Sequence, residues 1–234
     1  MRVLFSSIAL LSLSACSVVQ GSGTPATETR TIEAFSGVSA STAVDADVRI
    51  GAASDTLELT CDDNLVPLIE TVVEDGILRI RTAPEDSISP RTDCIVTVTT
   101  PELTSLTVSG AGAIGVDGSV AATALTLDIS GAGAIDVSDL DVDDLDLDLS
   151  GTGSAELAGA ATRAQASLSG TGRLNAEDLT VGTLDISISG AGGASITVTD
   201  TVEGSLSGTG GLEVFGGADV SGVSTSGTGR VTER

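Results

Sequence analysis

A four-residue pattern, Ser-Gly-x-Gly with Ala or Thr at x, constrains the fold most strongly, because it recurs seven times before the C-terminus. Its serines stand at positions 109, 130, 150, 169, 189, 207 and 226, so successive copies lie 18 to 21 residues apart. Self-similarity at such a period is typical of a solenoid, in which no repeat buries its apolar face alone and stacked repeats share one core.

Apolar and polar residues alternate on both sides of each copy. Around the second copy, Leu125, Leu127 and Ile129 precede the pattern, and Ile135 and Val137 follow it. A period of two indicates strands with one buried face, so each repeat predicts two strands that meet at a bend. We expect an all-β, three-sided parallel β-helix of about 20 residues per coil over residues 106–234. The crossover preference favours a right-handed coil, although the period alone leaves the hand open.

Glycine suits the bend for two reasons. A sharp turn between strands commonly needs a positive φ, and stacked corners about 4.8 Å apart leave no room for large side chains. We therefore predict a structural turn role, and not a ligand-binding one, for Gly110, Gly112, Gly131, Gly133, Gly151, Gly153, Gly170, Gly172, Gly190, Gly192, Gly208, Gly210, Gly227 and Gly229. The serines are expected to hydrogen-bond locally or along their ladder, which would offset backbone groups that the bend leaves unpaired.

The segment Gly110–Gly115 also fits the dinucleotide fingerprint G-x-G-x-x-G. That fingerprint needs a following helix whose N-terminus meets the pyrophosphate, whereas the sequence here leads into another strand. Membership in the sevenfold series explains these glycines better.

Composition narrows the chemistry. The chain has 33 acidic residues and 10 basic ones, no His and no Lys, and a net charge of −23. This charge disfavours nucleic acid and anionic membrane surfaces as partners. Without imidazole or lysine amine, the usual general base, Schiff-base former and commonest zinc ligand are missing. We expect a non-enzyme without a cofactor. The alternative is a polysaccharide-acting enzyme that uses paired carboxylates, although only Phe35 and Phe215 could stack on a sugar.

The densest acidic run lies between Asp139 and Asp148, where it alternates with Leu and Val. Alternation makes most of these carboxylates the solvated face of strands. Stacking could still crowd carboxylates from neighbouring coils, which would attract calcium. The repeat lacks the regular Asp of calcium-binding nonapeptides, so calcium is a weak candidate partner and we assign no metal ligand.

The N-terminus predicts export. Residues 1–15 have the charge and apolar run of a signal peptide, and Leu13-Ser14-Ala15-Cys16 resembles the lipobox of bacterial lipoproteins. In that class Cys16 becomes the lipidated first residue, and Ser17 after it is compatible with the outer membrane. The alternative is an ordinary signal peptide with an incidental cysteine. Residues 16–30 are polar and without period, so we predict a lipidated flexible tether there.

Residues 31–105 read as a less regular β section. Asp75-Gly76 predicts a two-residue hairpin turn between strands at 69–74 and 77–82, and a strand is expected at 95–99. The segment Asp62-Asp63-Asn64 is expected to cap a short helical turn through Leu68. Cys61 and Cys94 remain after lipidation, and such a pair in an exported chain without His predicts a structural disulfide.

Three segments carry a resemblance to a known family: DDNLVPLIETVVEDGILRIRT, the junction VTVTTPELTSLTVSGAGAI and the SG[AT]G series. Together they resemble the head GIN domain family, described as auto-transporter adhesin heads, over about residues 31–234. The naming tripeptide itself is absent. The resemblance implies a right-handed β-helix in bacterial envelope proteins and supplies no catalytic residues.

These observations favour a non-enzymatic, lipid-anchored envelope β-solenoid that acts as an adhesin or binding scaffold. Its ligand would be a protein or a glycan. A purely structural envelope protein is a further alternative to the polysaccharide enzyme.

Overall fold

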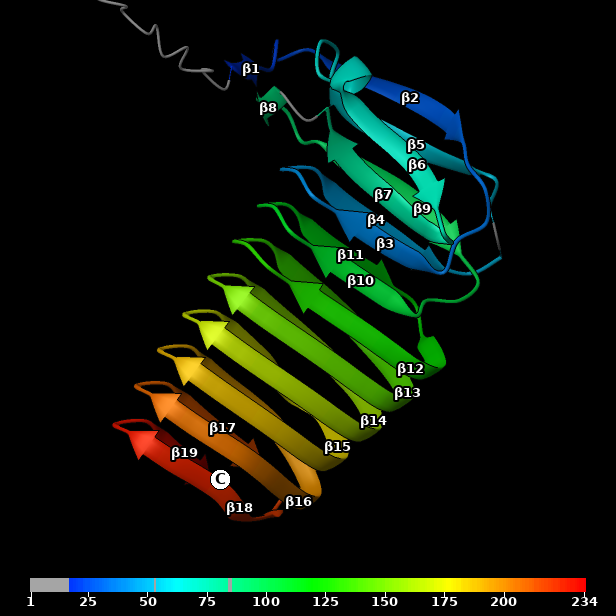
Figure 1. Cartoon of the computed structure of the whole chain (residues 1–234). Coiled ribbons are helices and arrows are strands. Elements are labelled where there is room, and N and C mark those ends of the chain that lie inside the picture. Colours follow the sequence, from blue (N-terminus) through cyan, green and yellow to red (C-terminus); the bar gives the residue numbers. More distant parts are fainter. Residues whose placement is uncertain (1–16, 53, 84–85) are drawn as a thin grey trace, which may run out of the picture.

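The structure is a computed structural model that describes residues 17–52, 54–83 and 86–234. Within these residues, all regular elements are strands apart from one turn of 3-10 helix. Seventeen strands form one continuous sheet that winds into a stack of coils, and β1 (Ser17–Gln20) pairs separately with β8 (Asp86–Ser89) (Figure 1). Cys16 and the predicted signal peptide lie outside the described residues.

The repeats form the predicted parallel β-helix. Its long strands each bend around a coil: β12 (Val120–Ile129), β13 (Ala134–Gly151), β14 (Ser154–Gly170), β15 (Arg173–Gly190) and β16 (Gly193–Gly208). Each pairs in parallel with the next, so that Leu127 lies beside Leu147 and Leu147 beside Ala166. The last levels are β17 (Gly211–Phe215), β18 (Asp219–Gly227) and β19 (Arg230–Glu233).

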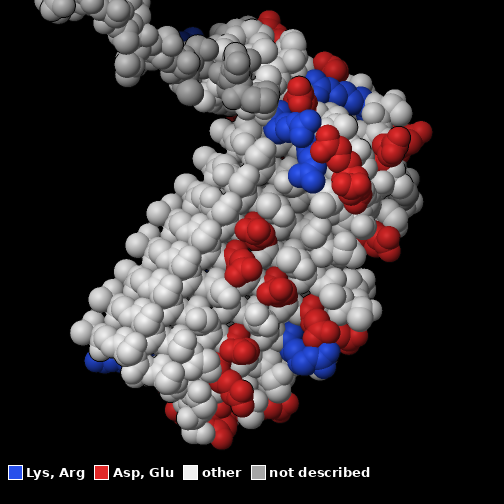
Figure 2. Space-filling view, viewed as in Figure 1, with Lys and Arg blue, Asp and Glu red and all other residues white. Residues whose placement is uncertain are grey.

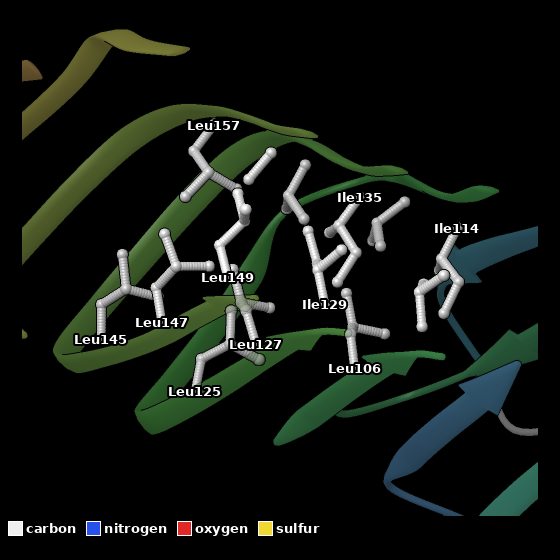
Figure 3. Close-up of a cluster of buried hydrophobic side chains, with 14 of the residues drawn as sticks. Leu106, Ile114, Leu125, Leu127, Ile129, Ile135, Leu145, Leu147, Leu149 and Leu157 are labelled. Atoms are coloured by element: carbon white, nitrogen blue, oxygen red, sulfur yellow. The ribbon is translucent and has the colours of Figure 1, made fainter. Parts of the chain in front are cut away.

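The core is a stack of aliphatic ladders. Leu125, Leu127, Leu145, Leu147 and Leu149 point inward toward one another and are at most 4% exposed (Figure 3). Burying one such side chain contributes roughly 1.5–3 kcal/mol, and in-register pairing repeats that gain at each level. A third inward segment, which includes Leu140 and Val142, closes the coil as the sequence predicted.

The N-terminal section continues into the solenoid without a break in the sheet at the predicted boundary, residue 105. The strands β3 (Gly37–Ala40) and β4 (Asp45–Ile50) form a complete coil level. On one side they pair with β10 (Ser105–Val108) and β11 (Ala113–Asp117). On the other side they pair with β7 (Ile77–Thr82) and β9 (Ile95–Thr100). The first coil therefore comes from residues 37–50, which lack the Ser-Gly-x-Gly pattern.

Antiparallel strands close the N-terminal end. Here β2 (Pro25–Thr31) pairs with β5 (Thr56–Asp62), and β5 pairs with β9. The hairpin of β6 (Ile69–Glu74) and β7 is confirmed, with Asp75 at φ 54° and Gly76 at φ 75°, as this turn requires. The predicted disulfide is also confirmed: Cys61 and Cys94 join β5 to the residue before β9, with a Cα–Cα distance of 4.2 Å.

The flexible tether predicted over residues 16–30 is wrong for the part of it that the structure describes. Residues 17–20 form β1 and residues 25–31 form β2, which pairs with β5 over seven residues. A polar segment without a hydrophobic period looks like a linker in the sequence. Here the edge of β5 supplies the backbone hydrogen bonds that such a segment cannot make by itself.

Asp62 does not cap a helix, which corrects a second expectation. The 3-10 turn η1 (Val66–Leu68) has Leu65 at its N-cap and no side-chain capping bond. The Asp62 side chain is instead fully buried and accepts backbone N–H bonds from Gly23 at 2.6 Å, Arg91 at 2.8 Å and Thr92 at 3.2 Å. Burial by itself raises the pKa of this carboxyl, but the bonds from Arg91, Thr92 and Gly23 outweigh it and hold the pKa below 3.8.

This arrangement makes Asp62 a source of acid sensitivity. A carboxyl with a lowered folded-state pKa stabilises the fold fully above its unfolded pKa, and that stability is lost as pH falls through the lower folded value. We expect Asp62→Asn to lower the unfolding midpoint at pH 7 and to flatten its decline below about pH 4. Thermal unfolding followed from pH 7 to pH 2 checks this. Asp128→Asn, which changes an exposed carboxylate, is the control. If both substitutions changed the unfolding midpoint equally, the hydrogen bonds to Asp62 would not be the cause.

Candidate binding face

One outer face of the solenoid is formed by the strand segments that precede the corners (Figure 1). Acidic side chains gather along the middle of this face, and an uncharged strip runs beside the corners (Figure 2). A groove of about 600 Å³ crosses the face from β13 to β16. We call it the acidic groove. Its charged and polar lining consists of Asp144, Asp146, Arg163, Gln165, Thr183, Asp185, Thr201 and Glu203.

One carboxylate of the groove is already paired. Arg163 donates to Asp144 through Nε at 2.6 Å and Nη2 at 2.8 Å, and the two residues are ladder neighbours. The hydrogen bond from Arg163, assisted by its charge, lowers the pKa of Asp144. The pair is about half exposed, so it contributes little stability. Asp146, Asp185 and Glu203 are therefore the carboxylates of the groove that form no ion pair among the described residues.

A second hollow, of about 390 Å³, lies next to the corners. It is lined by Asp128, Asp148 and six serines from four successive coils: Ser130, Ser150, Ser167, Ser169, Ser187 and Ser189. Two parallel rows of serines continue this surface through four coils, because Ser167, Ser187, Ser205 and Ser224 are ladder neighbours, as are Ser169, Ser189, Ser207 and Ser226. We call these rows the serine ladders. They offer hydroxyls at the repeat distance of the coils, about 4.8 Å.

The predicted glycines lie at the corners, and the two glycines of each copy differ. The first has a positive φ in five copies, between 108° and 127°, at Gly151, Gly170, Gly190, Gly208 and Gly227. Gly110 and Gly131 are not among the positive-φ residues. The second glycine is needed because the backbones of neighbouring coils approach closely: a Cβ on Gly153 would lie 2.5 Å from the carbonyl oxygen of Gly133.

The corner backbone is paired between coils. The Gly131 carbonyl accepts the N–H of Thr152 at 2.9 Å and of Gly153 at 3.1 Å, and later corners repeat this arrangement. The expectation that serine hydroxyls offset unpaired corner groups is therefore wrong. The seven pattern serines are exposed and make no side-chain hydrogen bond within the described part of the chain.

Within residues 17–52, 54–83 and 86–234, no group of three or more Cys, Asp or Glu side chains could hold a metal ion. Calcium at the acidic run 139–148 stays an expectation from the sequence. No helix of the described residues is long and apolar enough to span a membrane.

A stack of in-register coils with an aliphatic core and polar outer sheets defines a β-solenoid. The chain belongs to the family described as "Putative auto-transporter adhesin, head GIN domain", which it matches over residues 34–218. This confirms the resemblance found in the sequence. A comparison with curated proteins finds no match.

Solved structures share the fold at low identity. A "putative adhesin" from Bacteroides fragilis is similar with a TM-score of 0.85 and 21% identity, over 92% of this chain and 100% of that one. A "putative lipid binding protein" from Parabacteroides distasonis has a TM-score of 0.75 and 20% identity, over 93% and 100%. A "putative adhesin" from Parabacteroides merdae has a TM-score of 0.69 and 23% identity, over 93% and 99%.

Proposed function

We propose that this chain is a non-enzymatic binding protein of the bacterial cell envelope, anchored by a lipid on Cys16, with the outer membrane as its site. The acidic groove is the observation that supports binding most directly. It is a broad, solvent-open surface held by in-register strands, and Asp146, Asp185 and Glu203 lie in it. The family description as an adhesin head agrees with such a role.

The groove favours a neutral or cationic ligand. With a net charge of −23, the molecule repels polyanions, and the carboxylates of the groove accept hydrogen bonds from hydroxyls or ammonium groups. Uptake of a lipid chain, which the name of the Parabacteroides distasonis protein would suggest, finds less support here. The more apolar hollow beside Phe35 and Pro101 measures about 210 Å³, and ligand cavities usually begin near 300 Å³.

A charge-matched pair of variants tests the groove. We expect Asp146→Asn with Asp185→Asn and Glu203→Gln to weaken binding of a chitosan oligosaccharide about tenfold, since three exposed charge contacts of about 0.5 kcal/mol each are lost. The control changes Asp47, Asp136 and Glu156 in the same way, on the sheet that follows the corners. Isothermal titration calorimetry at low salt checks this. Equal losses in both triple variants, or tight binding of polygalacturonate, would reject the groove.

One observation favours the enzyme alternative. Asp185 and Glu203 are ladder neighbours in the groove, and retaining glycosidases use two carboxyls about 5 Å apart. Both side chains are exposed, however, whereas a carboxyl that acts as general acid is usually withdrawn from water. We therefore expect no release of reducing ends from polysaccharides. Turnover that disappears in Asp185→Asn would overturn the non-enzymatic proposal.

A further inference from the structure

The segment that follows Cys16 is fixed to the N-terminal end of the solenoid. Residues 17–20 pair in parallel with residues 86–89, and the Gly21 N–H donates to the Ser89 carbonyl at 3.0 Å. Asn64 donates from Nδ2 to the Gln20 carbonyl at 2.8 Å and accepts the Ser22 N–H at 2.8 Å. The buried Asp62 carboxylate then accepts the Gly23 N–H. Folded structure therefore begins one residue after the predicted lipidation site.

The same end exposes an apolar side chain. Val18 is 57% exposed, more than any other large hydrophobic residue in the described part of the chain, and Val72 follows at 36%. Val19 and Ile88 are ladder partners and both pack against the core, so Val18, the neighbour of Val19, faces away from it. An exposed valine two residues from a lipid anchor suits the boundary between headgroups and acyl chains.

The coils extend away from this end. The β1/β8 pair lies beside the antiparallel N-terminal strands, and the C-terminus lies at the opposite end of the stack (Figure 1). Nine levels run from β7 and β9 to β18 and β19, and at about 4.8 Å per step the last level stands about 40 Å from the first.

From these observations we infer that the β1/β8 end rests directly on the bilayer that holds the anchor, without a spacer, and that the coils project from the membrane. The inference rests on the proposed lipidation of Cys16. It places the acidic groove and the serine ladders on sides of a fixed column, with β18 and β19 farthest from the lipid.

Two single cysteines test this orientation in the full, lipidated chain. Ser87→Cys lies far from Cys16 in sequence but beside Val18 in space, and Ser226→Cys lies in the last level; both serines are exposed. The native Cys61 and Cys94 are joined and buried, so a thiol-reactive fluorophore labels only the new site. The labelled proteins are placed in phosphatidylcholine vesicles that carry a headgroup quencher. We expect quenching at position 87 to exceed quenching at position 226 several-fold.

A spacer variant supplies the control. Twenty Gly/Ser residues inserted between Cys16 and Ser17 give an end-to-end distance of about 25 Å and free rotation, so the difference between the two positions should disappear. Equal quenching at both positions in vesicle-bound protein without the spacer would overturn the orientation alone. If the unaltered chain does not bind vesicles, or if Cys16→Ala binds them equally well, the proposed anchor would be overturned as well.

Discussion

Gly151→Val should destabilise the protein by an amount on the order of 3 kcal/mol, because it combines two costs at one corner. Gly151 has a φ of 123°, where a β-branched side chain is strained, and a Cβ there would lie 2.5 Å from the carbonyl oxygen of Gly131. That carbonyl is the acceptor for Thr152 and Gly153, so moving it would also weaken the bonds between coils. Chemical denaturation of the purified protein measures the change.

Gly193→Val is the matched control. Gly193 does not have a positive φ, and a Cβ there would meet its nearest neighbour, the Gly211 carbonyl oxygen, at an ordinary 3.5 Å. Because valine suits a strand better than glycine does, we expect this variant to unfold at the same denaturant concentration as the wild type or at a higher one. If both variants lost similar stability, corner geometry would not be the reason for the glycines.

Removing the disulfide by Cys61→Ala with Cys94→Ala should lower the free energy of unfolding by about 3–4 kcal/mol. The bridge closes a loop with a sequence separation of 33, and its loss restores conformational freedom to the unfolded chain. Both cysteines are buried, so small apolar replacements leave no polar group unpaired. Unfolding of the double variant, compared with wild type in the presence and absence of reductant, measures the effect.

The reductant provides the internal check for this prediction. The reduced wild type should have nearly the same free energy of unfolding as the double variant, and the reductant should not change the stability of the variant. A wild type that keeps its full stability after complete reduction, shown by alkylation of both thiols, would contradict the stabilising role of the bridge. The hairpin at Asp75-Gly76 should persist in the folded protein in either case, because the pairing of β6 with β7 does not include either cysteine.

Local chemistry and repetition made much of the fold predictable. The hairpin followed from Asp75-Gly76, because that turn is specified by two residues, and the coils followed from a pattern that seven copies reinforce. The first coil was missed because its corner, Ser41-Thr42-Ala43-Val44, contains no glycine. A Cβ at Gly110 or Gly112 would strike the backbone of Thr42 or Val44. On the other side of Thr42 and Val44, toward β7 and β9, there is no short corner, because the chain passes through β8 between these two strands. The side chains of Thr42 and Val44 therefore have room.

The candidate site could be predicted only in part. Asp144 faces Arg163 nineteen residues on, whereas Asp185 faces Glu203 eighteen residues on. Both spacings equal those of the pattern serines in the same coils, 150 to 169 and 189 to 207, so the partners follow from the repeat. The hollow between them does not, because it depends on the shape of the folded sheet. Asp62 was misread as a cap for a similar reason: two of its three donors, Arg91 and Thr92, lie about 30 residues away. The alanines at inward positions of β14, where Ala164 and Ala166 lie beside Leu145 and Leu147 of β13, were a local sign that this coil differs from its neighbours.

The level made by β3 and β4 has a consequence for how the molecule is assembled. To form it, residues 37–50 must meet strands 68 residues later, as Asp45 does when it accepts the Ala113 N–H. This long closure is entropically the most expensive step, and it is needed only once. Every later coil joins residues only about 20 apart in sequence, so each coil can add to the one already formed. The number of repeats can therefore change by duplication or loss without altering the slow step, and the length of the solenoid can vary with it.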